Sequence, residues 1–212
     1  MTRAEARTAI RAATDQEASD ETAAQVLGTQ LNTWIDLEHK QLRRELSQIV
    51  PSLYTAVGSE QTPNATTGAL TMPSDYERLV RVEIKIGSTW YPVEEASDGL
   101  SPHLRELCVR EEGSTLFLAP VATATSYTVR IVYVQSVATL SADSGTGGVL
   151  LVPDGCEDII LARVEARVQT RFQRDPSPHI ARAREVLREQ KKYLRKRYGT
   201  TAQPGLRVTG RW

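Results

Sequence analysis

Apolar residues recur with helical spacing early in the chain. The series advances mostly in steps of three, four and seven residues: Leu27, Leu31, Trp34, Ile35, Leu42, Leu46 and Ile49. Such spacing places these side chains on one face of a helix, which Pro51 ends. Residues 1–19 are rich in Ala, Arg and Thr and show little apolar periodicity, so we expect either a short helix or a loose arm there.

Apolar and polar residues alternate as in half-buried strands after a polar loop at residues 57–68. Gly87-Ser88 is typical of a tight hairpin turn between the first two strands. The pattern predicts these strands: Leu79–Ile86, Thr89–Val93, Leu107–Arg110, Leu116–Leu118, Tyr127–Val134 and Val149–Val152. Short strands at short intervals favour a small antiparallel β-sandwich or barrel.

The chain returns to a helical pattern after Pro153. An i, i+4 row defines the first helix: Cys156, Ile160, Val164, Val168 and Phe172. Ser177 and Pro178 suit the cap and first turn of a second helix. That helix carries its own apolar stripe: Ile180, Ala183, Leu187, Leu194 and Tyr198. Two helices of similar length joined by a short break predict an antiparallel hairpin.

These elements predict an α+β fold with four parts. Residues 1–55 form an N-terminal helical segment, 56–152 a β-domain, 153–199 a C-terminal helical hairpin and 200–212 an extended arm. The first helix can bury its apolar stripe only against another element, and the C-terminal hairpin is the obvious partner. The expected architecture is a helical bundle with a β-domain inserted into it.

Composition narrows the class of protein. The 212 residues are 40% hydrophobic and 25% charged, as in an ordinary soluble globule. No apolar run approaches the roughly 20 residues that span a bilayer, and the N-terminus lacks a signal peptide's apolar core. Cys108 and Cys156 are the only cysteines, so neither a disulfide framework nor zinc-finger spacing is expected. We expect a protein made in a cytosol.

Positive charge is concentrated at the C-terminal end. From Arg163 onward there are 14 Lys/Arg and 4 Asp/Glu, a net charge of +10, and the remaining residues carry −10. Nine of these cations form the candidate contact surface: Arg163, Arg167, Arg171, Arg174, Lys191, Lys192, Arg195, Lys196 and Arg197. They indicate either contact with a polyanion or an acidic partner, or a solvated face with cations at a helix C-terminus.

Catalytic and metal sites are not indicated. His39, His103 and His179 show no metal-ligand spacing, and no nucleophile elbow is present. The Gly-rich stretch Ser141–Gly148 lacks the Lys-Ser/Thr of a phosphate loop. We interpret it as a flexible loop tip formed by Ser144, Gly145, Gly147 and Gly148. No enzyme activity, metal or cofactor is therefore expected.

The order of motifs resembles the head–tail adaptor proteins of tailed bacteriophages and related gene-transfer particles. The motifs are "LNTWIDLEHKQL" (Leu31–Leu42), "MPSDY" (Met72–Tyr76), "YPVEEAS" (Tyr91–Ser97), "GSTLFLAP" (Gly113–Pro120), "IVYVQSV" (Ile131–Val137) and "VPDGCEDIILARVEARV" (Val152–Val168). The resemblance spans residues 31–198. Tyr76 stands where Phe is common in that group, and Cys156 where an aromatic residue is usual.

The resemblance implies a structural virion protein at the head–tail junction, assembled in the host cytoplasm and without catalysis or a cofactor. It implies a ring of identical subunits, usually twelve, docked under the portal protein. The nine cations would contact the portal or neighbouring subunits, and a downstream tail or nozzle protein would bind the β-domain. Packaged DNA would pass through the central channel. The arm would order on a partner through Leu206, Val208 and Trp212.

Two other functions fit the same sequence. A tail-completion or tail-tube protein would equally lack an active site, and docking to the tail tube instead of the portal would identify it. A nucleic-acid-binding module would use the basic C-terminal helices, although no recognition motif is visible. It would bind duplexes in isolation, with an affinity that falls steeply as salt rises.

Overall fold

The computed structural model describes residues 1–14, 26, 28–95, 107–113, 115–120, 124 and 126–198. Within them the chain divides into two compact units, which are described separately. Met1–Val50 and residues 137–198 form the helical unit, and Pro51–Ser136 forms the β-unit. Residues 137–152, assigned to the β-domain from sequence, therefore belong to the helical unit. The predicted arm, with Leu206, Val208 and Trp212, lies outside the described residues.

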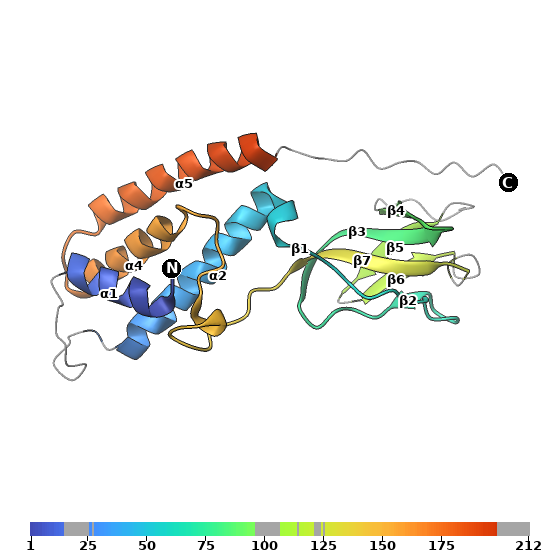
Figure 1. The fold of residues 1–212 in the computed structure, drawn as a ribbon, viewed down its shortest axis with the longest axis horizontal. Helices are drawn as coiled ribbons and strands as arrows, with labels where there is room; N and C mark the ends of the chain where they lie inside the picture. Colours follow the sequence, from blue (N-terminus) through green and yellow to red (C-terminus); the bar gives the residue numbers. More distant parts are fainter. Residues whose placement is uncertain are drawn as a thin grey trace. The chain divides into compact units, whose positions relative to one another are not determined.

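The described part of the helical unit holds the following α-helices: α1 (Arg3–Ala13), α2 (Gly28–Ile49), α4 (Glu157–Arg171) and α5 (Ser177–Tyr198). A short 3₁₀ helix, η2 (Thr146–Gly148), precedes α4. Figure 1 shows α1, α2 and α5 arranged around α4. Helix α4, for which an apolar row was predicted, is the central helix of this unit, because it packs against all three other described helices.

Arg3–Ala13 form a helix, one of the two expectations for residues 1–19; residues 15–19 lie outside the described part of the chain. Thr2 caps α1, since its Oγ1 accepts a hydrogen bond from the Glu5 amide at 3.2 Å. The Glu5 carboxylate in turn accepts one from the Thr2 amide at 2.8 Å. This reciprocal capping box starts the helix, and burial of Ala6 and Ile10 anchors it.

The apolar stripe predicted for the first long helix is confirmed in α2. Leu31, Ile35, Leu42 and Leu46 are each no more than 1% exposed. In α4 burial extends around most of the helix, with Ile159, Ile160, Leu161, Val164 and Val168 all in the core. Only Ala183 and Leu194 of α5 are buried, so α5 lies on the surface and covers α4 along one narrow line.

The β-unit contains seven described strands. They are β1 (Thr55–Val57), β2 (Ala69–Leu70), β3 (Tyr76–Ile86), β4 (Thr89–Glu95), β5 (Cys108–Glu112), β6 (Thr115–Ala119) and β7 (Thr128–Gln135). Their order is β1-β7-β3-β4-β5-β6-β2, and Figure 1 labels each strand. A 3₁₀ turn, η1 (Pro51–Tyr54), leads into β1.

The prediction of a barrel is wrong for the described strands. β1 and β2 lie at the two ends of the strand order and do not pair with each other, so the strands do not close. The pairing is also not wholly antiparallel, because β4 and β5 run parallel over a two-residue contact, Glu94↔Cys108 and Glu95↔Val109. One hydrophobic cluster nevertheless spans the β-unit and includes Val82, Leu116 and Ile131.

Sequence reasoning placed one strand wrongly and missed two. Val149–Val152 was expected as a strand, but only Val149 makes an isolated β-bridge, to Thr2. The short strands β1 and β2 escaped notice because three and two residues show no alternation. The predicted hairpin is confirmed, with Gly87 at φ +62° between β3 and β4.

The Pro-Ser-Asp corner before β3 is fixed by Asp75. Its carboxylate accepts hydrogen bonds from the Tyr133 hydroxyl at 2.7 Å and from Gln135 Nε2 at 2.6 Å. The Asp75 carbonyl also accepts one from the Ser136 amide at 2.6 Å. The side-chain bonds lower the pKa of Asp75, and burial raises the pKa of Tyr133 to about 12. The corner is thereby tied to the end of β7.

Removing the Tyr133 hydroxyl should weaken this corner. We expect Tyr133→Phe to lower the free energy of unfolding by about 1 kcal/mol, since a hydrogen bond to a carboxylate is lost while the ring stays packed. Urea denaturation measures the change. Tyr127→Phe, in which no described hydrogen bond of the side chain is lost, is the matched control and should change little. Equal effects of the two variants would contradict the role given to Asp75.

Candidate functional site

Arg163 and Arg167 on α4 form ion pairs with α2. Arg167 Nε donates to Glu38 Oε1 at 2.8 Å. Arg163 donates from Nη2 to Glu45 Oε2 at 3.0 Å, and its Nη1 lies 3.7 Å from Glu38 Oε2. Glu38 is buried, with 4% of its surface exposed. Two of the nine predicted contact cations thus hold α4 to α2 inside one chain.

Arg171 and Arg174 lie at the C-terminal end of α4. Both are exposed, and Arg174 stacks over the Phe172 ring at 5.9 Å. The described residues form no ion pair with either arginine. These two cations are therefore available to an acidic partner in a way that Arg163 and Arg167 are not.

The remaining predicted cations lie along α5. Lys192, Arg195, Lys196 and Arg197 are exposed and Lys191 is half-buried. Arg197 donates to the Tyr193 hydroxyl at 2.6 Å, and this hydrogen bond raises the pKa of Arg197. Tyr193 is half-exposed.

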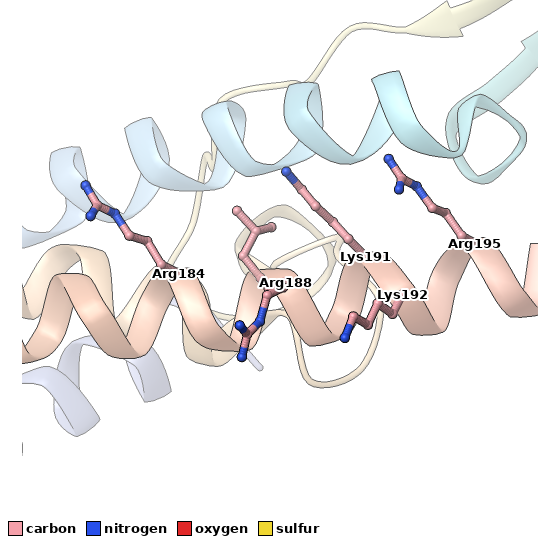
Figure 2. A pocket seen from close by; sticks show the side chains of 6 residues that line it. Arg184, Arg188, Lys191, Lys192 and Arg195 are labelled. Carbon is pink, nitrogen blue, oxygen red and sulfur yellow. The ribbon is translucent and has the colours of Figure 1, made fainter.

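A shallow groove runs along the middle of α5. Six residues line it: Arg184, Leu187, Arg188, Lys191, Lys192 and Arg195. We call it the α5 groove; its volume is about 370 Å³. In Figure 2, Arg184, Lys191 and Arg195 extend from one side of α5 and Arg188 and Lys192 from the other. Five cations thus flank a single leucine.

Sequence reasoning missed Arg184 and Arg188 as members of this surface. Their signal was present, because positions 184, 188, 191 and 195 follow helical steps of four, three and four, and 192 lies four residues after 188. The apolar stripe drew attention to Leu187 as core, whereas Leu187 is only half-buried and forms part of the groove.

The Gly-rich stretch before α4 packs against α1. Asp143 accepts hydrogen bonds from Arg3 Nε at 2.8 Å and Arg7 Nη1 at 3.1 Å. Although burial opposes it, these bonds lower the pKa of Asp143. Ser144 and Gly145 are exposed, whereas an added Cβ at Gly147 or Gly148 would collide with this segment's own atoms. The stretch therefore packs closely on itself at Gly147 and Gly148 and holds α1 through Asp143.

The histidines carry no described catalytic arrangement. His39 in α2 is 1% exposed. His179 Nδ1 lies 2.9 Å from the buried Glu165 carboxylate and so links α5 to α4. His103 falls outside the described residues. Nowhere in the described part of the chain do three His, Cys, Asp or Glu side chains gather as metal ligands.

Comparison with known proteins identifies the family of this chain. The family model described as "SU10 adaptor protein" matches residues 1–209. The chain belongs to the SU10 adaptor protein family. This is a phage head–tail adaptor family, so the resemblance found in the sequence is confirmed. A comparison with curated proteins gave no match.

Family membership places the chain among phage structural proteins that associate with other virion proteins. The family is one of adaptors and not of enzymes. No described helix is long and apolar enough to cross a bilayer. The cationic surfaces of the helical unit are accordingly candidates for binding surfaces, and their ligands are the open question.

Proposed function

We propose that this chain is one subunit of a twelve-membered ring that joins the capsid vertex to the tail beneath the portal protein. The observation that carries the proposal is the family match over residues 1–209. In this proposal the packaged DNA passes through the ring, a downstream tail or nozzle protein binds below it, and assembly takes place in the host cytoplasm.

The helical unit would supply the contacts with the portal or with neighbouring subunits. Arg171 and Arg174 are the best candidates on α4, because they are exposed and have no described acidic partner. Lys196 and Arg197, at the end of α5, extend the same kind of surface. Charged pairs that are weak singly become effective when a ring repeats them. The predicted arm residues Leu206, Val208 and Trp212 remain proposed partner contacts.

Mass measurement of the purified protein, alone and mixed with its cognate portal protein, tests this function. We expect a complex of portal and ring, and we expect Arg171→Glu/Arg174→Glu to weaken it by at least about tenfold, because like charges replace attractive ones. Arg171→Lys/Arg174→Lys keeps the charge and serves as the control. Charge reversal at Arg163 or Arg167 would be uninformative, since it would break the pairing with Glu38.

The same mass measurement, repeated with purified tail tube, distinguishes the adaptor from a tail-completion protein. A ring that binds purified tail tube and not portal would identify a tail-completion protein and would overturn the proposed position. A protein that remains monomeric with every virion partner would overturn the ring itself.

A further inference from the structure

Helix α5 is the most cationic element that the structure describes. Between Ser177 and Tyr198 it holds eight Lys/Arg and two Asp/Glu. Only Ala183 and Leu194 are buried, so nearly all of this charge lies at the surface. Neither Glu185 nor Glu189 lines the α5 groove.

The groove cations are not neutralised within the described part of the chain. Arg163 and Arg167 on α4 have glutamate partners on α2, and Arg182 on α5 lies 3.9 Å from Glu165. By contrast, the described residues offer no ion-pair partner to any of the five groove cations. The like charges therefore repel one another until an anionic ligand binds.

The spacing of these cations matches an extended array of negative charge. Arg184 and Arg195 are eleven residues apart, which corresponds to about 16 Å along a helix. Double-stranded DNA carries about one phosphate charge per 1.7 Å of its axis, so about ten phosphates lie within that length. Side chains project to both sides of α5 (Figure 2), as two rows that could follow a phosphodiester backbone.

We propose that the α5 groove binds double-stranded DNA through its phosphates, without reading base sequence. Arginine and lysine are the residues that most often contact phosphate oxygens, and such contacts position a duplex without specifying its sequence. An acidic protein is the competing ligand. Protein interfaces have apolar cores from which lysine is depleted, whereas this groove offers one half-buried leucine among five cations, two of them lysines.

DNA binding by the α5 groove goes beyond the proposed function, because all of the residues that line the groove lie on one helix of a single folded chain. It requires neither a ring nor a portal protein. The proposed portal contacts Arg171 and Arg174 lie outside the α5 groove, so a variant that loses DNA binding through Arg188 keeps them, and a variant of those two arginines that fails to dock keeps the groove. The two can therefore fail separately.

Fluorescence anisotropy with a labelled 20-base-pair duplex and the full chain tests the proposal. A plot of log K against log[NaCl] should have a slope of about −4 to −5, the value expected for five neutralised phosphates. Arg188→Gln/Arg195→Gln should flatten the slope by about 2 and weaken binding about tenfold at 100 mM NaCl. Both side chains are exposed, so the variant should keep its melting temperature.

The matched control removes two exposed arginines from the β-unit, Arg78→Gln/Arg110→Gln, for the same change in net charge. It should bind DNA as the wild type does. Equal loss in both variants would show a response to net charge alone and would overturn the proposal. So would absence of binding at 50 mM NaCl, or a polyglutamate peptide that binds the groove more tightly than the duplex does.

Discussion

Replacing Glu38 with alanine is expected to lower the free energy of unfolding by about 2 kcal/mol. The buried carboxylate neutralises Arg167 and lies 3.7 Å from Arg163 Nη1. Its loss removes the described acidic partner of Arg167 and leaves Arg163 paired with Glu45, and breaking a buried ion pair from one side is costly. Because the Arg167 side chain is 43% exposed, water can solvate part of its charge. The expected loss of stability is therefore smaller than for a fully buried ion pair. Guanidinium chloride denaturation measures it.

Glu45→Ala is the matched control for Glu38→Ala. Glu45 lies on the same helix, pairs with Arg163 at 3.0 Å and accepts a hydrogen bond from Gln41, and 27% of its side chain is exposed, so we expect a loss below about 1 kcal/mol. Changing both partners to an apolar pair, Glu38→Met/Arg167→Met, should recover part of the stability, since no charge is left buried without a partner. A Glu38→Ala variant as stable as the wild type would contradict the proposed locking of α4 to α2.

Acidification is expected to destabilise the helical unit through His39. The side chain is 1% exposed, and neither ring nitrogen has a hydrogen-bond partner among the described residues. Burial first, and then the charge of Arg43, lower the pKa of His39 from 6.5 to about 4, against the opposing effect of Asp36. The folded state thus disfavours the protonated ring. The contribution of the neutral His39 ring to the free energy of unfolding should be fully present above pH 6.5. It should fall by about 3 kcal/mol as the pH drops towards 4.

His39→Leu isolates this contribution from that of the carboxylates. Leucine fills a similar volume without polar atoms, so the variant should be at least as stable at pH 7 as the wild type. Its unfolding free energy should fall less between pH 6.5 and pH 4, and the difference between the two curves is the effect of His39. Parallel curves would show that the buried ring does not titrate in this range.

Local patterns explain why the helices and the main hairpin could be predicted. The stripe that includes Leu31 and Leu42 in α2 follows a period that residues adjacent in sequence define. The β3–β4 hairpin needed only alternation and the Gly87 turn. The strand expected at Val149–Val152 does not form, because a short apolar run can equally pack beside a helix. Leu150 is buried, and its amide donates a hydrogen bond to the Met1 carbonyl, just before α1.

The candidate site could be predicted only in part. Sequence identified cations on both C-terminal helices but could not say which of them are neutralised. Arg167 pairs with Glu38 across 129 positions, and nothing near either residue in the sequence indicates the other. Glu83 in β3 shows the same limit. Alternation placed it on a polar face, yet it is 5% exposed and accepts hydrogen bonds from Arg81 and Arg130 at 2.6 Å.

The sequence by itself determined the helices, most of the strands and the concentration of positive charge after Arg163. It also carried the resemblance to head–tail adaptors, which the match to the SU10 adaptor family confirms. Only the tertiary structure decided which charges are neutralised and which remain at the surface. The physical reason is that periodicity is a property of neighbouring residues, whereas an ion pair depends on where folding brings residues far apart in the chain. Arg163 and Arg195 look alike in the sequence, but one meets Glu45 and the other borders an open groove.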